Sequence, residues 1–129
     1  MTLYHFTSLR NLASIKMYGI IKGDVPITMM GGYNAPWLTS DSNPSSQGWT
    51  GGGDKDKVRL TIEIPDGDHN LWKWTDVMKE HLETLVSKPE KELAQKWFDI
   101  LNETGGGQDN WYIYKGVVSP KWIGKVDFL

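Results

Sequence analysis

The first twenty residues restrict the possible folds more than any other part of the sequence. Residues 3–7 predict a short strand, with Leu3 and His5 on one face. Thr7 and Ser8 suit the N-cap of a helix, and apolar residues recur at helical spacing over 9–15. Gly19 then supplies the residue that commonly follows the end of a helix. The chain therefore opens with a strand, a helix and a glycine stop.

Alternating and aromatic segments predict five further strands or extended stretches. Val58–Ile64 alternates apolar and polar side chains, and short strands are expected at 36–40, 111–114 and 123–129. Trp72 and Trp74, two residues apart, predict one face of an extended stretch. Elsewhere, residues 22–56 are rich in Gly, Pro, Ser, Asn and Asp, and we expect them to be irregular apart from 36–40. Long irregular segments in compact domains tend to be functional.

Helical patterns fall between these strands. The first is expected to start at Thr75-Asp76, and the second follows Ser87 as N-cap and ends at the glycines 105–107. The residues expected to be buried in the first helix are Met78, Leu82, Leu85 and Val86. Strands and helices in this order, within 129 residues, predict one domain over residues 1–129 of the α+β class.

Composition excludes several function classes. The absence of cysteine removes disulfides, zinc–thiolate sites and cysteine nucleophiles, and favours a reducing cytoplasm. No apolar run is long enough for a membrane span, and the opening residues do not form a secretory signal. The net charge of −2, with no block of like charges, argues against avid binding to duplex nucleic acid. A nucleotide or a single strand held by stacking stays compatible with the sequence.

Few residues carry recognisable chemistry. The P-loop, dinucleotide-binding, nucleophile-elbow and zinc-protease motifs are missing from the sequence, and no metal site is expected. His5 and Thr7 share one face of the opening strand, so they form either a satisfied core pair or the floor of a pocket. Trp49 lies between Gly48 and Thr50 in a polar segment, which is an unusual place for a core tryptophan.

Three segments, in order along the chain, resemble ADP-ribosyltransferase-like domains. The first is Leu3-Tyr4-His5-Phe6-Thr7 with the Asn-Leu, Ile and Gly-Ile positions that follow it. The second is Trp37-Leu38-Thr39-Ser40-Asp41 with Ser45-Ser46-Gln47-Gly48-Trp49, and the third is Trp111 through Ile123. The resemblance is closest to small bacterial and viral members, including toxins that modify DNA, and more distant to poly-ADP-ribose polymerases.

The resemblance implies a fold and a substrate. The expected fold has two small antiparallel sheets around a nucleotide cleft, with flanking helices, and the expected substrate is NAD. His5 would hydrogen-bond the adenosine ribose, and the backbone of Phe6 would hold the nicotinamide amide. Trp49, or Tyr33 as a lid, would stack on the nicotinamide ring. The residues expected to add polar contacts are Thr7, Thr39, Ser40 and Ser46.

The chain departs from the family at the catalytic carboxylate. Family members usually carry a glutamate at the start of the closing strand, which stabilises the positive charge that develops as nicotinamide leaves. Asn110 stands at that position here, and Asp109 precedes it. Three alternatives follow: Asp109 supplies the carboxylate, Glu103 reaches in from the preceding helix, or the domain binds its nucleotide without transfer.

The sequence thus favours NAD-dependent ADP-ribosyl transfer to a macromolecule, with a protein acceptor preferred to single-stranded nucleic acid. The first alternative is a degenerate domain of the same fold that binds NAD, a related nucleotide or a partner protein. An alternative of another class is a protein-interaction module. Its contact surface would comprise Met29, Met30, Tyr33 and Trp49.

Overall fold

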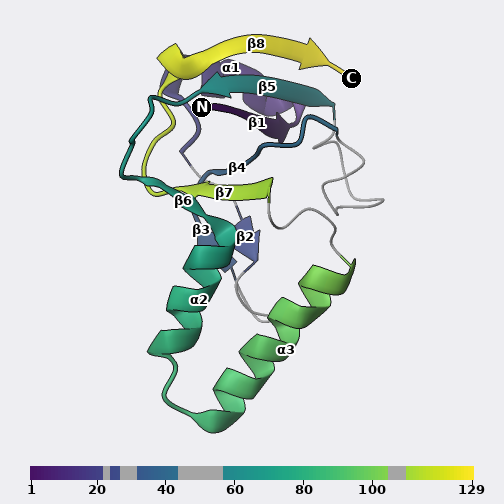
Figure 1. The fold of residues 1–129 in the computed structure, drawn as a ribbon. Coiled ribbons are helices and arrows are strands. Elements are labelled where there is room, and N and C mark those ends of the chain that lie inside the picture. Colours follow the sequence, from purple (N-terminus) through teal and green to yellow (C-terminus); the bar gives the residue numbers. More distant parts are fainter. Residues whose placement is uncertain (22–23, 27–31, 44–56, 105–109) are drawn as a thin grey trace.

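The computed structural model describes residues 1–21, 24–26, 32–43, 57–104 and 110–129 (Figure 1). The strands are β1 Thr2–Thr7, β2 Asp24–Pro26, β3 Gly32–Asn34, β4 Trp37–Thr39, β5 Val58–Glu63, β6 Leu71–Lys73, β7 Trp111–Tyr114 and β8 Ile123–Phe128. The helices are α1 Leu9–Tyr18, α2 Trp74–Thr84 and α3 Lys88–Thr104, and a 3₁₀ turn, η3, spans Pro120–Trp122. The order of strands and helices confirms the α+β class. None of the helices in these ranges is long and apolar enough to cross a membrane.

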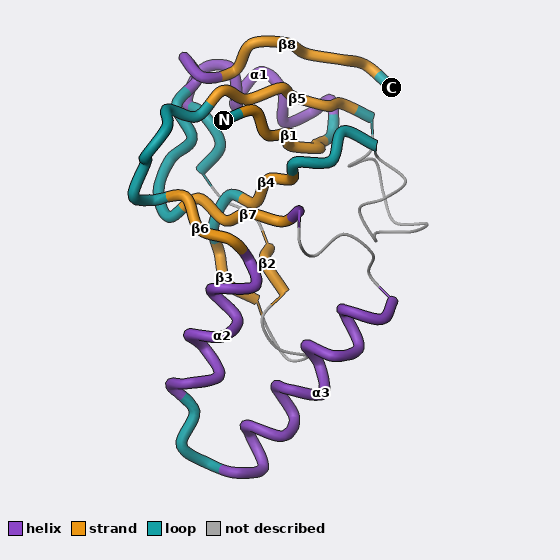
Figure 2. The backbone as a smooth tube through the Cα atoms, in the orientation of Figure 1, coloured by secondary structure: helices purple, strands orange, loops and turns teal. Residues whose placement is uncertain are grey.

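The described strands form a six-stranded sheet in the order β6-β7-β4-β1-β5-β8 and a separate two-stranded sheet of β2 and β3. Neighbours in the large sheet are antiparallel. The arrangement differs from the two small sheets that the resemblance implied, because β1 and β4 join the two halves of the large sheet. That join is narrow: β1 pairs with β5 at six positions but with β4 only at Tyr4↔Thr39. Figure 2 shows β8, β5 and β1 on one side of this join and β4, β7 and β6 on the other.

Helices cover the two faces of the sheet in different places. Ile15 of α1 packs with Leu3, Leu60 and Ile62 in one buried cluster. A second cluster joins Trp74 and Met78 of α2 to Trp111 and Ile113 of β7. The aromatic ring of Trp74 stacks on Phe98 of α3 at 5.5 Å. Trp111 and Ile113, alternate residues of β7, thus pack in the second cluster, while Tyr114 packs in the first.

The opening unit forms as the sequence predicts. Ser8 is the N-cap of α1, and Gly19 follows the helix with φ 85° and ψ −174°, a conformation that is essentially restricted to glycine. The Gly19 N–H donates to Ile15 O at 2.8 Å. A Cβ at Gly19 would lie 2.1 Å from the carbonyl oxygen of Val118, which pairs with Ile20 in an antiparallel bridge.

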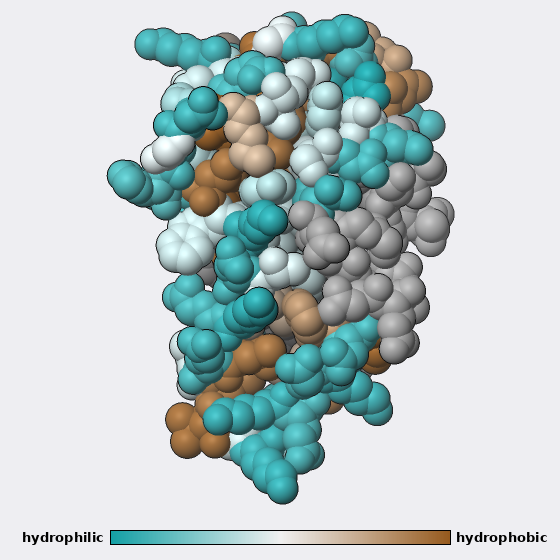
Figure 3. Space-filling model, in the orientation of Figure 1, coloured by the Kyte–Doolittle hydropathy of each residue, from teal (hydrophilic) through white to brown (hydrophobic). Residues whose placement is uncertain are grey.

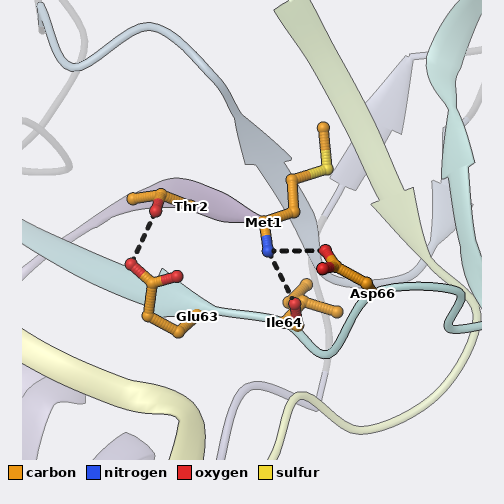
Figure 4. A network of polar contacts seen from close by, with 5 residues as sticks. All are labelled: Met1, Thr2, Glu63, Ile64 and Asp66. Carbon is orange, nitrogen blue, oxygen red and sulfur yellow. Dashed lines mark hydrogen bonds and ion pairs between the residues drawn. The ribbon is translucent and has the colours of Figure 1, made fainter.

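The other end of β1 is held by polar contacts to the end of β5 (Figure 4). The amino group of Met1 donates to Ile64 O at 2.9 Å and lies 3.3 Å from Asp66 Oδ1. The Thr2 hydroxyl donates to Glu63 Oε1 at 2.6 Å. These contacts fix the register of β1 against β5.

Three predictions in the middle of the chain differ from the structure. Trp72 and Trp74 do not share an extended face, because Trp72 belongs to β6 and Trp74 begins α2. Val86, expected to be buried, is 92% exposed just after α2 ends. On the face drawn in Figure 3, brown apolar side chains near the lower end lie among teal hydrophilic ones. The segment predicted to be irregular also contains the short strands β2 and β3.

Candidate functional site

Four polar side chains of the described residues are buried. They are His5, Thr7, Ser8 and Thr39, each less than 9% exposed. The first three lie on β1 or directly after it, and Thr39 lies opposite Tyr4 on β4. Burying polar groups is unfavourable unless they are hydrogen-bonded. We refer to this region, with the neighbouring Ser40 and Asn110, as the β1–β4 junction.

His5 links the two strands through its side chain. Its Nδ1 lies 2.9 Å from the carbonyl oxygen of Trp37 on β4. A carbonyl oxygen only accepts, so Nδ1 is the donor, and in the neutral ring Nε2 is then an acceptor. The imidazole also meets the Trp37 ring edge-on, with 6.5 Å between centroids. His5 is therefore a partnered core residue through Nδ1, and its other nitrogen has the chemistry to accept a hydroxyl.

Thr7 lies on the same buried face of β1 as His5. Thr7 pairs with Val58 of β5 and His5 pairs with Leu60, and both of these partners are buried. Its hydroxyl is 3.5 Å from Nδ2 of Asn11 in α1, which is the long end of the hydrogen-bond range. The contact therefore ties the start of α1 only loosely to the end of β1.

Ser40 and Asn110, 70 residues apart in sequence, contact each other directly. The Ser40 N–H donates to Asn110 O at 2.9 Å, and the Ser40 hydroxyl donates to Asn110 Oδ1 at 2.9 Å. These bonds continue the pairing of β4 with β7 one step past Thr39↔Trp111. Thr39 Oγ1 in turn accepts from the Asp41 N–H at 3.1 Å. Two site residues from different predicted motifs are thus brought together.

Asn110 lies where the resemblance expects a carboxylate, just before β7. Its side-chain oxygen already accepts from Ser40, so its amide NH₂ is the group suited to a ligand hydroxyl. An amide carries no charge and stabilises a developing cation far less than a carboxylate does. Asn110 therefore does not supply the negative charge that the family's glutamate supplies at this position.

Phe6, whose backbone the resemblance assigns to nicotinamide, is 4% exposed and pairs with Arg59 on β5. Sequence reasoning missed Arg59. Its Nη1 donates to Ser42 O at 2.9 Å, beyond the end of β4, and its Nη2 lies 3.0 Å from Asp127 Oδ2. The bond from Arg59 lowers the pKa of Asp127 below its usual value. Arg59 thus places a positive charge next to the loop after β4. The sequence feature that could have indicated Arg59 is its polar position in the alternating strand β5.

The other predicted site residues cannot be placed in the junction. Ser46, Trp49 and Asp109 lie outside the described residues. Tyr33 lies in β3 opposite Val25, and only its backbone is described. Glu103 lies near the end of α3, also without a described side chain.

Within the described ranges, no group of three or more His, Cys, Asp or Glu side chains is placed to hold a metal ion. Comparison of the chain with protein-family models, with curated proteins and with solved structures gives no significant match. The function is therefore argued from the junction itself.

Proposed function

We propose that the chain binds NAD at the β1–β4 junction and transfers its ADP-ribosyl group to a macromolecular acceptor, with release of nicotinamide. One observation supports the proposal: three of the four buried polar side chains of the described residues, those of His5, Thr7 and Thr39, belong to residues to which the resemblance assigns NAD contacts. These residues lie on or next to β1 and β4, which join the two halves of the sheet and pair only at Tyr4↔Thr39.

The junction offers donors and acceptors that suit a dinucleotide. We assign a ribose hydroxyl to His5, as the resemblance implies, with Nδ1 of the ring donating to Trp37 O. The Asn110 amide can donate to a second hydroxyl while Ser40 holds its oxygen. One buried hydroxyl, that of Ser8, has no partner among the described residues and is suited to a further ligand contact.

The reaction breaks the bond between ribose C1′ and the nicotinamide nitrogen. Nicotinamide leaves with the electron pair, which neutralises its pyridinium charge, and the acceptor nucleophile bonds to C1′ and loses a proton. Positive charge builds on the ribose between these events, so a carboxylate speeds the reaction. We assign that role to Asp109, next to Asn110 in the sequence.

A second candidate function is nucleotide binding without transfer. The observation that favours it is the neutral Asn110 side chain, held by Ser40 at 2.9 Å. Losing one preorganised electrostatic group typically lowers the rate by about 10²–10³-fold. A domain of this kind would bind NAD or a related nucleotide and release little nicotinamide.

For the acceptor, we favour a protein over single-stranded nucleic acid. The chain has 14 basic and 16 acidic residues, and a strong nucleic-acid binder requires a clustered positive surface. This choice is independent of whether NAD binds, and it is tested by supplying each acceptor class with labelled NAD.

The test of the proposed function measures NAD binding by calorimetry and nicotinamide release by chromatography. The wild type is expected to do both, and Asp109→Asn is expected to bind NAD but release nicotinamide at least about 100-fold more slowly. Asp76→Asn, on the exposed first turn of α2, is the matched control and should behave as the wild type. Binding without release by the wild type would establish the second candidate instead. Absence of NAD binding would reject both and favour the protein-interaction module.

A further inference from the structure

We propose that the start of α1 is a phosphate subsite, in which the Ser8 hydroxyl donates to an oxygen of the NAD pyrophosphate. The inference rests on the proposed function, because it assigns one part of the same ligand to a surface next to His5. It starts from a feature that the fold alone does not explain.

That feature is the Ser8 side chain. Ser8 has the extended backbone of an N-cap, with φ −92° and ψ 158°, but its side chain makes no capping hydrogen bond. Its Oγ is buried and has no partner among the described residues, and the residue is 2% exposed. An N-cap serine ordinarily accepts from an N–H of the first turn, and an unpaired buried hydroxyl is unfavourable. The hydroxyl thus lowers the stability of the ligand-free protein.

The charge around Ser8 suits an anion. α1 has ten residues, and none in its first turn is acidic. The N-terminal end of a helix carries a partial positive charge and exposed N–H groups, which together favour phosphate. Arg10 adds a cation within the same turn. A carboxylate in the first turn would compete with a phosphate for this end of the helix, and α1 has none there.

The proposed subsite is three residues from His5 along the chain. Ser8 follows Thr7 directly, and His5 is three residues earlier, roughly 10 Å along an extended chain. A nucleoside phosphate spans a comparable length. The long 3.5 Å contact between Asn11 and Thr7 leaves the amide of Asn11 only weakly committed. A phosphate next to Ser8 and a ribose next to His5 are therefore compatible with one bound dinucleotide.

The test uses pyrophosphate, ADP and adenosine as probes of the wild type and of Ser8→Ala, with binding measured by calorimetry. A hydrogen bond to a charged group contributes about 1.5–3 kcal/mol, so Ser8→Ala is expected to weaken pyrophosphate and ADP roughly tenfold or more. Adenosine, which has no phosphate, should bind both proteins equally. Ser8→Ala should also unfold at the same denaturant concentration as the wild type or a higher one, because it removes an unpaired hydroxyl.

Ser119→Ala is the matched control. Ser119 caps η3, where its Oγ accepts from the Lys121 N–H at 3.2 Å, and the adjoining Val118 lies against the opposite end of α1. This variant is expected to lose stability but to keep the affinity for pyrophosphate.

The outcomes separate this inference from the proposed function. Binding of NAD by the wild type, with pyrophosphate and NAD affinities unchanged in Ser8→Ala, would overturn the phosphate subsite and leave the function standing. Pyrophosphate binding that depends on Ser8, without NAD binding, would support an anion site and reject the function. A loss of stability in Ser8→Ala would show that the hydroxyl is paired within the protein, and would also overturn the subsite.

Discussion

Substitutions of His5 separate its role in the fold from its role in binding. His5→Asn keeps a donor near the position of Nδ1, because the amide nitrogen of asparagine is attached to Cγ just as Nδ1 is. It removes the ring and with it Nε2. His5→Ala removes both, including the 2.9 Å bond to Trp37 O that spans β1 and β4. We expect His5→Asn to preserve most of the stability and to lose NAD affinity, whereas His5→Ala loses both.

The expected magnitudes follow from the burial and the hydrogen bond of His5. The residue is 8% exposed, so His5→Ala leaves a cavity in addition to losing the bond. Together these effects are expected to lower the free energy of unfolding by about 2–4 kcal/mol, and His5→Asn by about 1 kcal/mol. One neutral hydrogen bond from Nε2 to a ribose hydroxyl contributes about 0.5–1.5 kcal/mol, so either variant should weaken NAD roughly threefold to tenfold.

Urea unfolding followed by circular dichroism gives the free energy of unfolding. Calorimetry without urea, at one temperature for all variants, gives the NAD affinity. His5→Gln provides a further comparison, since its amide reaches the ε position and should recover part of the affinity. Unchanged NAD affinity in a folded His5→Asn would refute the ligand role, and His5 would then be a core residue only. A His5→Asn variant as unstable as His5→Ala would show that the bond to Trp37 O does not hold the two strands together.

Two further predictions concern the stability of the fold. Gly19→Ala combines a positive φ with a Cβ 2.1 Å from Val118 O, so it should lower the free energy of unfolding by about 3–5 kcal/mol in urea unfolding. Gly67→Ala, also at positive φ but with nothing within 4 Å, should lower it by only about 1–2 kcal/mol, and equal losses would contradict the close contact. Hydrogen bonding to Arg59 lowers the folded-state pKa of Asp127. This pair therefore stabilises the protein at pH values above the ordinary carboxyl pKa of 3.8. The stabilisation is lost as the pH falls through the lower, folded-state pKa. The stability difference between the wild type and Asp127→Asn should therefore shrink between pH 6 and pH 3, and a constant difference in thermal midpoint would argue against the ion pair.

The elements that sequence reasoning predicted well are those fixed by neighbouring residues. The strand, helix and glycine stop of residues 3–19 depend on alternation, a cap and one positive-φ position, all of which are readable locally. Val58–Glu63 forms β5 because its alternating apolar residues have a buried face on which to pack.

The failures lie where tertiary contacts override the local pattern. Trp74 joins a helix because its ring packs between Phe98 and Trp111, at 5.5 Å and 5.3 Å, and neither neighbour is close to it in sequence. The contact of Ser40 with Asn110 depends in the same way on the pairing of β4 with β7. The resemblance indicated both residues, but no local pattern relates one to the other.

The same dependence explains why the junction concentrates polar side chains. Backbone pairing of β1 with β4 is confined to Tyr4↔Thr39. Side-chain hydrogen bonds therefore supply the remaining polar contacts between these strands. His5 bonds across the strands, and the Ser40 hydroxyl bonds to Asn110 at the next edge. Under the proposed function, the residues that connect the halves of the sheet are also the ones assigned to a ligand's hydroxyl groups. A substitution that removes such a side chain alters folding and binding together, which is why a variant that keeps the Nδ1-like donor of His5 is the more informative one.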